Sequence, residues 1–262
     1  MNRTYSKLAL LLLAALPLTM RAGGPETEYR TERDNDVQFR TGFEIEKKLT
    51  RRLSASWNEE LRLKNDLHDI DRIYSDLGLT VKVKKWLKLS AGYTYIAVLH
   101  QGKKKDNYHN YWDSRHRVTA GVTFSYKTPT HWTFSLKERA QVTFFADDDF
   151  DKHEKSDPSW ALKSKVTAGY ACQRVPLEPY VSVELCNTLN APKLADGNYL
   201  DKVRSCVGTS YRINKHHSLN FFYRFDYNLD KKLDVKKSGR LKSLTEAKDY
   251  NSIFGIAYKF KF

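Results

Sequence analysis

The chain has little of the residues that define several protein classes. Only seven of its 262 residues are Pro and twelve are Gly, which excludes collagen-like and Pro/Gly-rich disordered chains. Its three cysteines are too few for a disulfide scaffold and too scattered for a zinc module. The mean hydropathy is negative, and this excludes a bundle of membrane-spanning helices.

What the chain has in abundance is positive charge and aromatic side chains. It carries 45 Lys and Arg against 31 Asp and Glu, a formal net charge of +14. Charge alone would suggest a soluble, basic protein such as a nucleic-acid binder. The 16 Tyr, 13 Phe and 5 Trp do not fit that interpretation, because they are a large aromatic surface for so charged a chain.

Residues 1–22 have the pattern of a secretory signal peptide. Arg3 and Lys7 precede the apolar stretch Leu8–Leu18, and the small residues Ala22, Gly23 and Gly24 follow it. The stretch is shorter than the roughly 20 apolar residues of a membrane-spanning helix. Cleavage near Ala22 would lower the net charge to +11. Export also argues against a nucleic-acid partner.

Beyond residue 36 the chain alternates apolar and polar residues in eleven segments. In the stretch Leu87–Leu99, for example, every second residue is Leu, Ala or Tyr. This period of two predicts strands with one apolar and one polar face. Such strands could form a soluble sandwich or a barrel in a membrane.

The connections and the last strand favour the barrel. Short turns, as near Lys48–Arg51, alternate with long connections such as Gln101–Ser114 and Asp230–Asp249, as in outer-membrane barrels. Asn65–Asp69 is expected to be a further long connection. The chain also ends on an aromatic strand, which resembles the insertion signal that the barrel-assembly machinery recognises. Its residues are Phe254, Tyr258, Phe260 and Phe262.

The fold class predicted is all-β: a single antiparallel, up-and-down transmembrane β-barrel over residues 36–262. Bacterial single-chain barrels have even strand numbers, so about 12 strands are expected. The missing strand would lie in the N-terminal segment 23–35, where Glu26–Arg33 is the only candidate. That stretch has almost no apolar face, so the alternative is a segment inside the lumen.

The chain resembles the family catalogued as domain of unknown function 2490, which comprises outer-membrane β-barrel proteins of Gram-negative bacteria. The resemblance implies such a barrel and no established activity, so no catalytic residue is carried over. It covers nearly all of the mature chain, in the stretches Glu46–Asn65, Val81–Ile96, Tyr111–Lys127, Pro176–Asn187, Tyr211–Phe225 and Gly255–Phe262.

The polar faces of the strands are rich in Lys and Arg. In a small barrel such side chains form an ion-pair network that fills the interior. The alternative is a cationic pore that favours anions. The lumen-facing basic candidates are Arg62, Arg72, Lys82, Arg115, Arg117, Arg139, Lys163, Lys165, Arg204, Arg212 and Arg224.

Two polar clusters could suggest chemistry. Tyr111–Arg117 contains Ser, His and Asp, but neighbours in a strand point in alternating directions and cannot form a triad on their own. Asp147–Asp151 lacks the turn Gly and closing Glu of a calcium loop. No catalytic, cofactor or metal motif is present. We therefore predict no catalytic residue, no cofactor and no metal.

Three further features carry predictions. Cys186 and Cys206 share inward parity on adjacent strands and are candidates for a disulfide. Glu59 and Glu138 fall on the apolar face, where a bulge could turn them inward or a partner could cover them. Four tryptophans fall near strand ends, where aromatic girdles form, although Trp is also a common core residue. They are Trp86, Trp112, Trp132 and Trp160.

The function predicted from these features is non-catalytic: a structural or surface protein, or a small porin-like pore that favours anions. The alternatives are an outer-membrane lipid hydrolase and a soluble periplasmic lipid-binding barrel. The expected location is the bacterial outer membrane. The expected partners are outer-membrane lipid, lipopolysaccharide and the barrel-assembly machinery, with no nucleic acid.

Overall fold

The described part of the protein consists of strands and their connections. The computed structural model describes residues 28–100, 110–145, 158–190, 200–235 and 241–262. Among these residues, no helix is long and apolar enough to cross a membrane. The predicted signal peptide and Asp147–Asp151 lie outside the described residues. The strands are β1 Glu28–Lys48, β2 Leu53–Lys64, β3 Asp69–Lys84, β4 Leu87–His100, β5 Tyr111–Lys127, β6 Trp132–Phe145, β7 Ser159–Tyr170, β8 Leu177–Thr188, β9 Leu200–Arg212, β10 His217–Val235 and β11 Leu241–Lys261.

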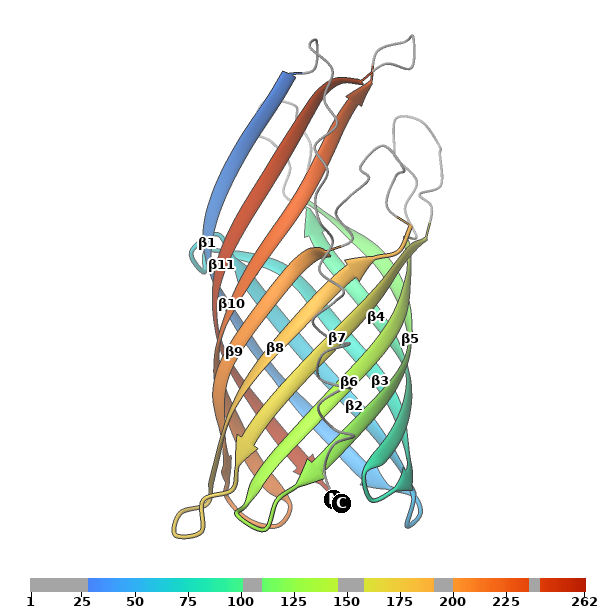
Figure 1. Cartoon of the computed structure of the whole chain (residues 1–262), viewed down its shortest axis with the longest axis vertical. Coiled ribbons are helices and arrows are strands. Elements are labelled where there is room, and N and C mark those ends of the chain that lie inside the picture. Colours follow the sequence, from blue (N-terminus) through green and yellow to red (C-terminus); the bar gives the residue numbers. More distant parts are fainter. Residues whose placement is uncertain (1–27, 101–109, 146–157, 191–199, 236–240) are drawn as a thin grey trace, which may run out of the picture.

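The strands form one closed barrel, so the predicted fold class is confirmed. Each strand pairs antiparallel with its neighbour in the chain, and β1 pairs with β11 to close the sheet. Figure 1 shows the tilted strands around a central axis, with the C-terminus at the end that carries the short turns. We call this the short-turn end and the opposite one the long-connection end.

The expected twelfth strand is not present among the described residues. The stretch Glu28–Arg33 is the first part of β1. It is therefore neither a separate strand nor a segment inside the lumen. With eleven strands in alternating directions, the first and the last run the same way. The closing pair is therefore parallel, from Glu28 opposite Ser243 to Glu46 opposite Lys261.

Two of the expected long connections are shorter than predicted. The β2–β3 connection has four residues, because Asn65, Asp66 and Leu67 take positive φ angles of 54°, 53° and 70° and reverse the chain tightly. Most of Asp230–Asp249 belongs to β10 and β11. These two strands and β1 extend past the rest of the barrel at the long-connection end (Figure 1).

The alternating pattern places apolar side chains on the outside of the barrel. Leu77, Val118 and Val181 are 51–55% exposed there, although they come from different parts of the barrel wall. The inward side chains on the same strands are polar or charged for the most part. Two tryptophans lie near each end and are 43–49% exposed: Trp86 and Trp132 at the short-turn end, and Trp112 and Trp160 at the long-connection end.

Candidate functional site: the polar lumen

Three large, adjoining cavities lie inside the described part of the barrel and are lined mostly by polar residues. The central cavity has a volume of about 760 Å³. An outer cavity of about 540 Å³ shares Arg62, Arg72, Lys202 and Arg204 with it. An inner cavity of about 750 Å³, toward the short turns, shares Lys137 among other residues. The three cavities therefore follow one another along the barrel axis.

Charge is unevenly distributed along these cavities. The described lining of the outer cavity has six Lys or Arg and six Asp. The central cavity has eleven Lys or Arg and five carboxylates. The inner cavity has seven Lys or Arg and two Glu. The central and inner cavities thus carry an excess of positive charge among the described lining residues.

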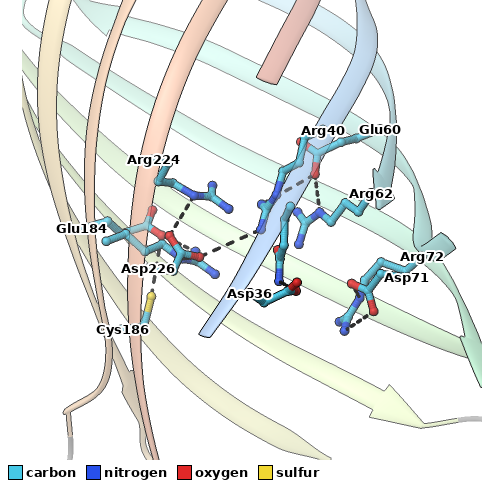
Figure 2. A network of polar contacts seen from close by, with 12 residues as sticks. Asp36, Arg40, Glu60, Arg62, Asp71, Arg72, Glu184, Cys186, Arg224 and Asp226 are labelled. Atoms are coloured by element: carbon cyan, nitrogen blue, oxygen red, sulfur yellow. Dashed lines mark hydrogen bonds and ion pairs between the residues drawn. The ribbon is translucent and has the colours of Figure 1, made fainter. Parts of the chain in front are cut away.

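An ion-pair network covers one wall of the lumen (Figure 2). At its centre is Asp226 on β10, which is 2% exposed. Its carboxylate lies 2.8 Å from Arg224 Nε, 3.3 Å from Arg204 Nε and 3.9 Å from Arg40 Nη2. One carboxylate thus compensates guanidinium groups from three strands, β1, β9 and β10.

Two glutamates extend this network around the barrel. Glu184 on β8 accepts from Arg204 Nη1 at 2.5 Å and from Arg139 Nη2 at 3.4 Å. Glu60 on β2 pairs with Arg62 and lies 3.9 Å from Arg40. The network therefore connects β6 with β2 by way of β8, β9, β10 and β1. Part of the predicted lumen-filling network is present, and the central cavity lies beside it.

A small apolar cluster lies inside the lumen, although the inward faces of the strands were predicted to be polar. Tyr74, Ile96 and Val98 are 1–7% exposed and pack together on β3 and β4. The guanidinium carbon of Arg62 lies 3.9 Å from the centroid of the Tyr74 ring, and that of Arg117 lies 5.8 Å from it. The aromatic face therefore holds two lumen arginines in place.

Ten of the eleven basic candidates line these cavities. Lys82 lines the inner cavity, and nine others line the central one. Arg212 does not line any of the three: it is near the short turns, where it pairs with Glu178. The nine on the central cavity are Arg62, Arg72, Arg115, Arg117, Arg139, Lys163, Lys165, Arg204 and Arg224.

Arg40 and Tyr74 also face the lumen, although neither is among the predicted residues. Arg40 is 5% exposed and shares inward parity with Gln38, between the outward residues Phe39 and Thr41. The alternation could have identified it. The same alternation indicates that Tyr74 faces inward, because it lies between Arg72 and Asp76 and its neighbour Ile73 faces outward.

The Tyr111–Arg117 segment divides between the two faces of β5. Ser114 and His116 are on the outward face, where they contact the hydroxyls of Tyr95 at 2.9 Å and Tyr93 at 2.6 Å. Asp113 points inward and accepts from Arg115 Nε at 2.7 Å. The Ser, His and Asp of this segment are thus separated by the barrel wall.

The predicted disulfide between Cys186 and Cys206 is wrong, and all three cysteines are free. Cys186 lies opposite Lys202, and Cys206 lies opposite Ser182. A turn midway between the two cysteines would have placed Cys186 opposite Cys206. The register of β8 and β9 in the structure differs from that pairing by four residues. The two thiols are therefore far apart along the ladder.

The expected bulges at Glu59 and Glu138 are also absent. The register of each strand is continuous at these positions, so both carboxylates stay on the outward face. Each accepts a hydrogen bond from a serine on the next strand: Ser75 Oγ at 2.5 Å for Glu59, and Ser164 Oγ at 2.6 Å for Glu138. Each carboxylate thus stays on the outward face with a hydrogen bond from the opposed serine, and no bulge turns it toward the lumen.

The residues of the expected insertion signal lie along β11. Phe254 is 51% exposed and Phe262 is 58% exposed. Tyr258 and Phe260 share the outward parity of Phe254 and are half-buried. In the described residues no group of three or more His, Cys, Asp or Glu could hold a metal ion.

The fold and the lumen define a single-chain, closed β-barrel with an apolar outer wall and a charged interior. The chain belongs to the DUF2490 family of proteins of unknown function, whose model matches residues 29–235. A comparison with curated proteins finds no match.

Two solved structures are similar in fold. The NanC porin has a TM-score of 0.47 at 12% identity, covering 86% of this chain and 99% of the porin chain. The β domain of the Bordetella autotransporter BrkA has a TM-score of 0.39 at 11% identity, covering 66% of this chain and 75% of that domain. At these values the likenesses carry no argument about function.

Proposed function

We propose that this protein is a non-catalytic pore of the bacterial outer membrane that favours anionic solutes. The observation that carries the proposal is the central cavity, where eleven Lys or Arg side chains stand against five carboxylates. A cationic lining lowers the energy of an anion inside the passage and raises that of a cation. The inner cavity continues the same excess of positive charge.

The outer wall supports the location in a membrane. Large apolar side chains such as Phe254 and Tyr126 are 51% and 66% exposed. A soluble protein rarely exposes so continuous an apolar surface, whereas lipid would cover it. The exposed tryptophans near both ends fit the two interfaces of a bilayer. The partners we propose are outer-membrane lipid, lipopolysaccharide and, during insertion, the barrel-assembly machinery.

Liposome swelling tests the pore directly. Purified, folded protein is reconstituted, and swelling is compared in isosmotic gluconate, glucose and glucosamine. We expect the anionic gluconate to enter fastest and the cationic glucosamine slowest. The variant K137Q/K163Q/K165Q should reduce this order, whereas the exposed turn variant K85Q/K215Q should keep it. Absence of swelling, or faster entry of glucosamine, would refute the proposal.

Two rival functions have their own tests. A lipid hydrolase would release fatty acid when the folded protein is incubated with phospholipid and lipid A, and such release would overturn the non-catalytic proposal. A soluble periplasmic lipid carrier would remain in solution without detergent. We expect no fatty acid above that of a protein-free sample, and recovery of the protein in the outer-membrane fraction.

A further inference from the structure

Four cationic side chains form a square on the inward face of β6 and β7. Lys137 lies directly opposite Lys165, and Arg139 lies directly opposite Lys163. Opposed residues on one face of an antiparallel pair have Cβ atoms roughly 4.5–5.5 Å apart, and like charges at such positions destabilise the sheet. We call these four residues the cation square. All four line the central cavity.

The protein compensates this square only in part. Arg139 Nη2 lies 3.4 Å from Glu184, but that carboxylate also pairs with Arg204 at 2.5 Å. In the described part of the chain, no carboxylate lies within ion-pair distance of Lys137, Lys163 or Lys165. Moreover, Arg139 Nε is buried and has no hydrogen-bond partner. Positive charge therefore accumulates at one place, with Glu184, which Arg139 shares with Arg204, as its internal counterion among the described residues.

We propose that the cation square binds an oxyanion of two or more negative charges, such as the phosphate group of a small solute. Three ammonium groups and a guanidinium offer many donors around one cavity wall, and charge-assisted hydrogen bonds suit phosphate oxygens. A divalent anion gains more from four nearby cations than chloride does, because the attraction grows with charge. The inference deepens the proposed pore function and rests on it for the route by which the anion arrives.

Calorimetric titration of the folded barrel in a nonionic detergent tests this site without any need for conduction. Inorganic phosphate and glycerol 1-phosphate are the two titrants, at constant chloride. We expect saturable binding of the phosphate group, weakened about tenfold or more in K163Q/K165Q. The variant K163R/K165R keeps both charges and should keep binding. Unchanged far-UV circular dichroism and heat-modifiable gel mobility establish that each variant is folded.

The matched control is K82Q/K88Q. Lys82 and Lys88 are also directly opposed, but they are exposed and line the inner cavity. Their replacement should leave phosphate binding unchanged. Absence of saturable binding, or equal losses in both double variants, would overturn the inference. Binding in a barrel that does not conduct would refute the pore alone, whereas anion conduction without phosphate binding would refute the cation square alone.

Discussion

Asp226 lies within ion-pair distance of three arginines, more than any other carboxylate in the described network. These arginines are Arg40, Arg204 and Arg224. Removal of Asp226 should therefore lower the stability of the barrel strongly. D226N keeps the shape but removes the carboxylate that Arg224 pairs with, and it leaves Arg204 with Glu184 and Arg40 with Glu60 as their remaining partners. We expect the free energy of unfolding to fall by about 3–5 kcal/mol. Urea unfolding of the reconstituted barrel, followed by tryptophan fluorescence, measures it.

The control for Asp226 is an exposed ion pair. Glu178 pairs with Arg212, and their side chains are 42% and 60% exposed. E178Q should therefore cost less than about 1 kcal/mol. A similar loss in both variants would contradict the central place of Asp226 in the network.

Glu138 offers a second prediction at the scale of one residue. Its carboxylate is on the outward face and accepts a hydrogen bond from Ser164. An acid facing lipid costs free energy, so E138L should raise the stability of the barrel in a bilayer by up to about 2 kcal/mol. Unfolding in phosphatidylcholine vesicles measures the change. A loss of stability would contradict this and show that the hydrogen bond from Ser164 outweighs the cost of the lipid-facing carboxylate.

Among the elements, a row of glycines and aromatic rings fixes how β8 to β11 pack inside the barrel. Gly208 on β9 lies between Tyr180 on β8 and Phe222 on β10. Phe222 in turn lies opposite Gly255 on β11. A Cβ atom at Gly255 would overlap the Phe222 ring, and one at Gly208 would lie 2.6 Å from the Tyr180 hydroxyl. Each ring thus occupies the space that the opposed glycine leaves open.

This row predicts a coupled pair of substitutions. G255A should lower the free energy of unfolding by about 1–3 kcal/mol, because the ring has to move. F222A removes the ring, so F222A/G255A should cost less than the sum of the single variants. G169A is the control, since its Cβ would meet its nearest neighbours at 3.6 Å. Simple additivity of the two substitutions, measured by urea unfolding, would contradict the account.

The elements also show how far sequence reasoning reached. The alternation predicted the strands and most inward cations, because successive side chains in a regular strand point to opposite faces. It did not predict the closing pair or the register of β8 with β9. Both depend on how the strands pair with one another in the folded barrel, as the four-residue difference in register at Cys186 shows. The inward position of the apolar cluster at Tyr74 does follow from the alternation, but its packing against Arg62 and Arg117 of other strands does not.

At the scale of the whole molecule, part of the net charge of +14 is concentrated inside the barrel. The described outer cavity is balanced, with six residues of each sign, while the central and inner cavities carry the excess of Lys and Arg. An anion that enters from the long-connection end would pass from the balanced outer cavity into the positively charged central and inner cavities. This polarity is the basis of the proposed selectivity.

The reversal potential of the reconstituted protein in a planar bilayer under a KCl gradient tests this central claim most directly. We predict a potential of the sign set by chloride, with a chloride-to-potassium permeability ratio above unity. K137Q/K163Q/K165Q should bring the ratio toward unity, and K85Q/K215Q should leave it unchanged. A potential of the sign set by potassium, or a bilayer that stays silent, would contradict the account.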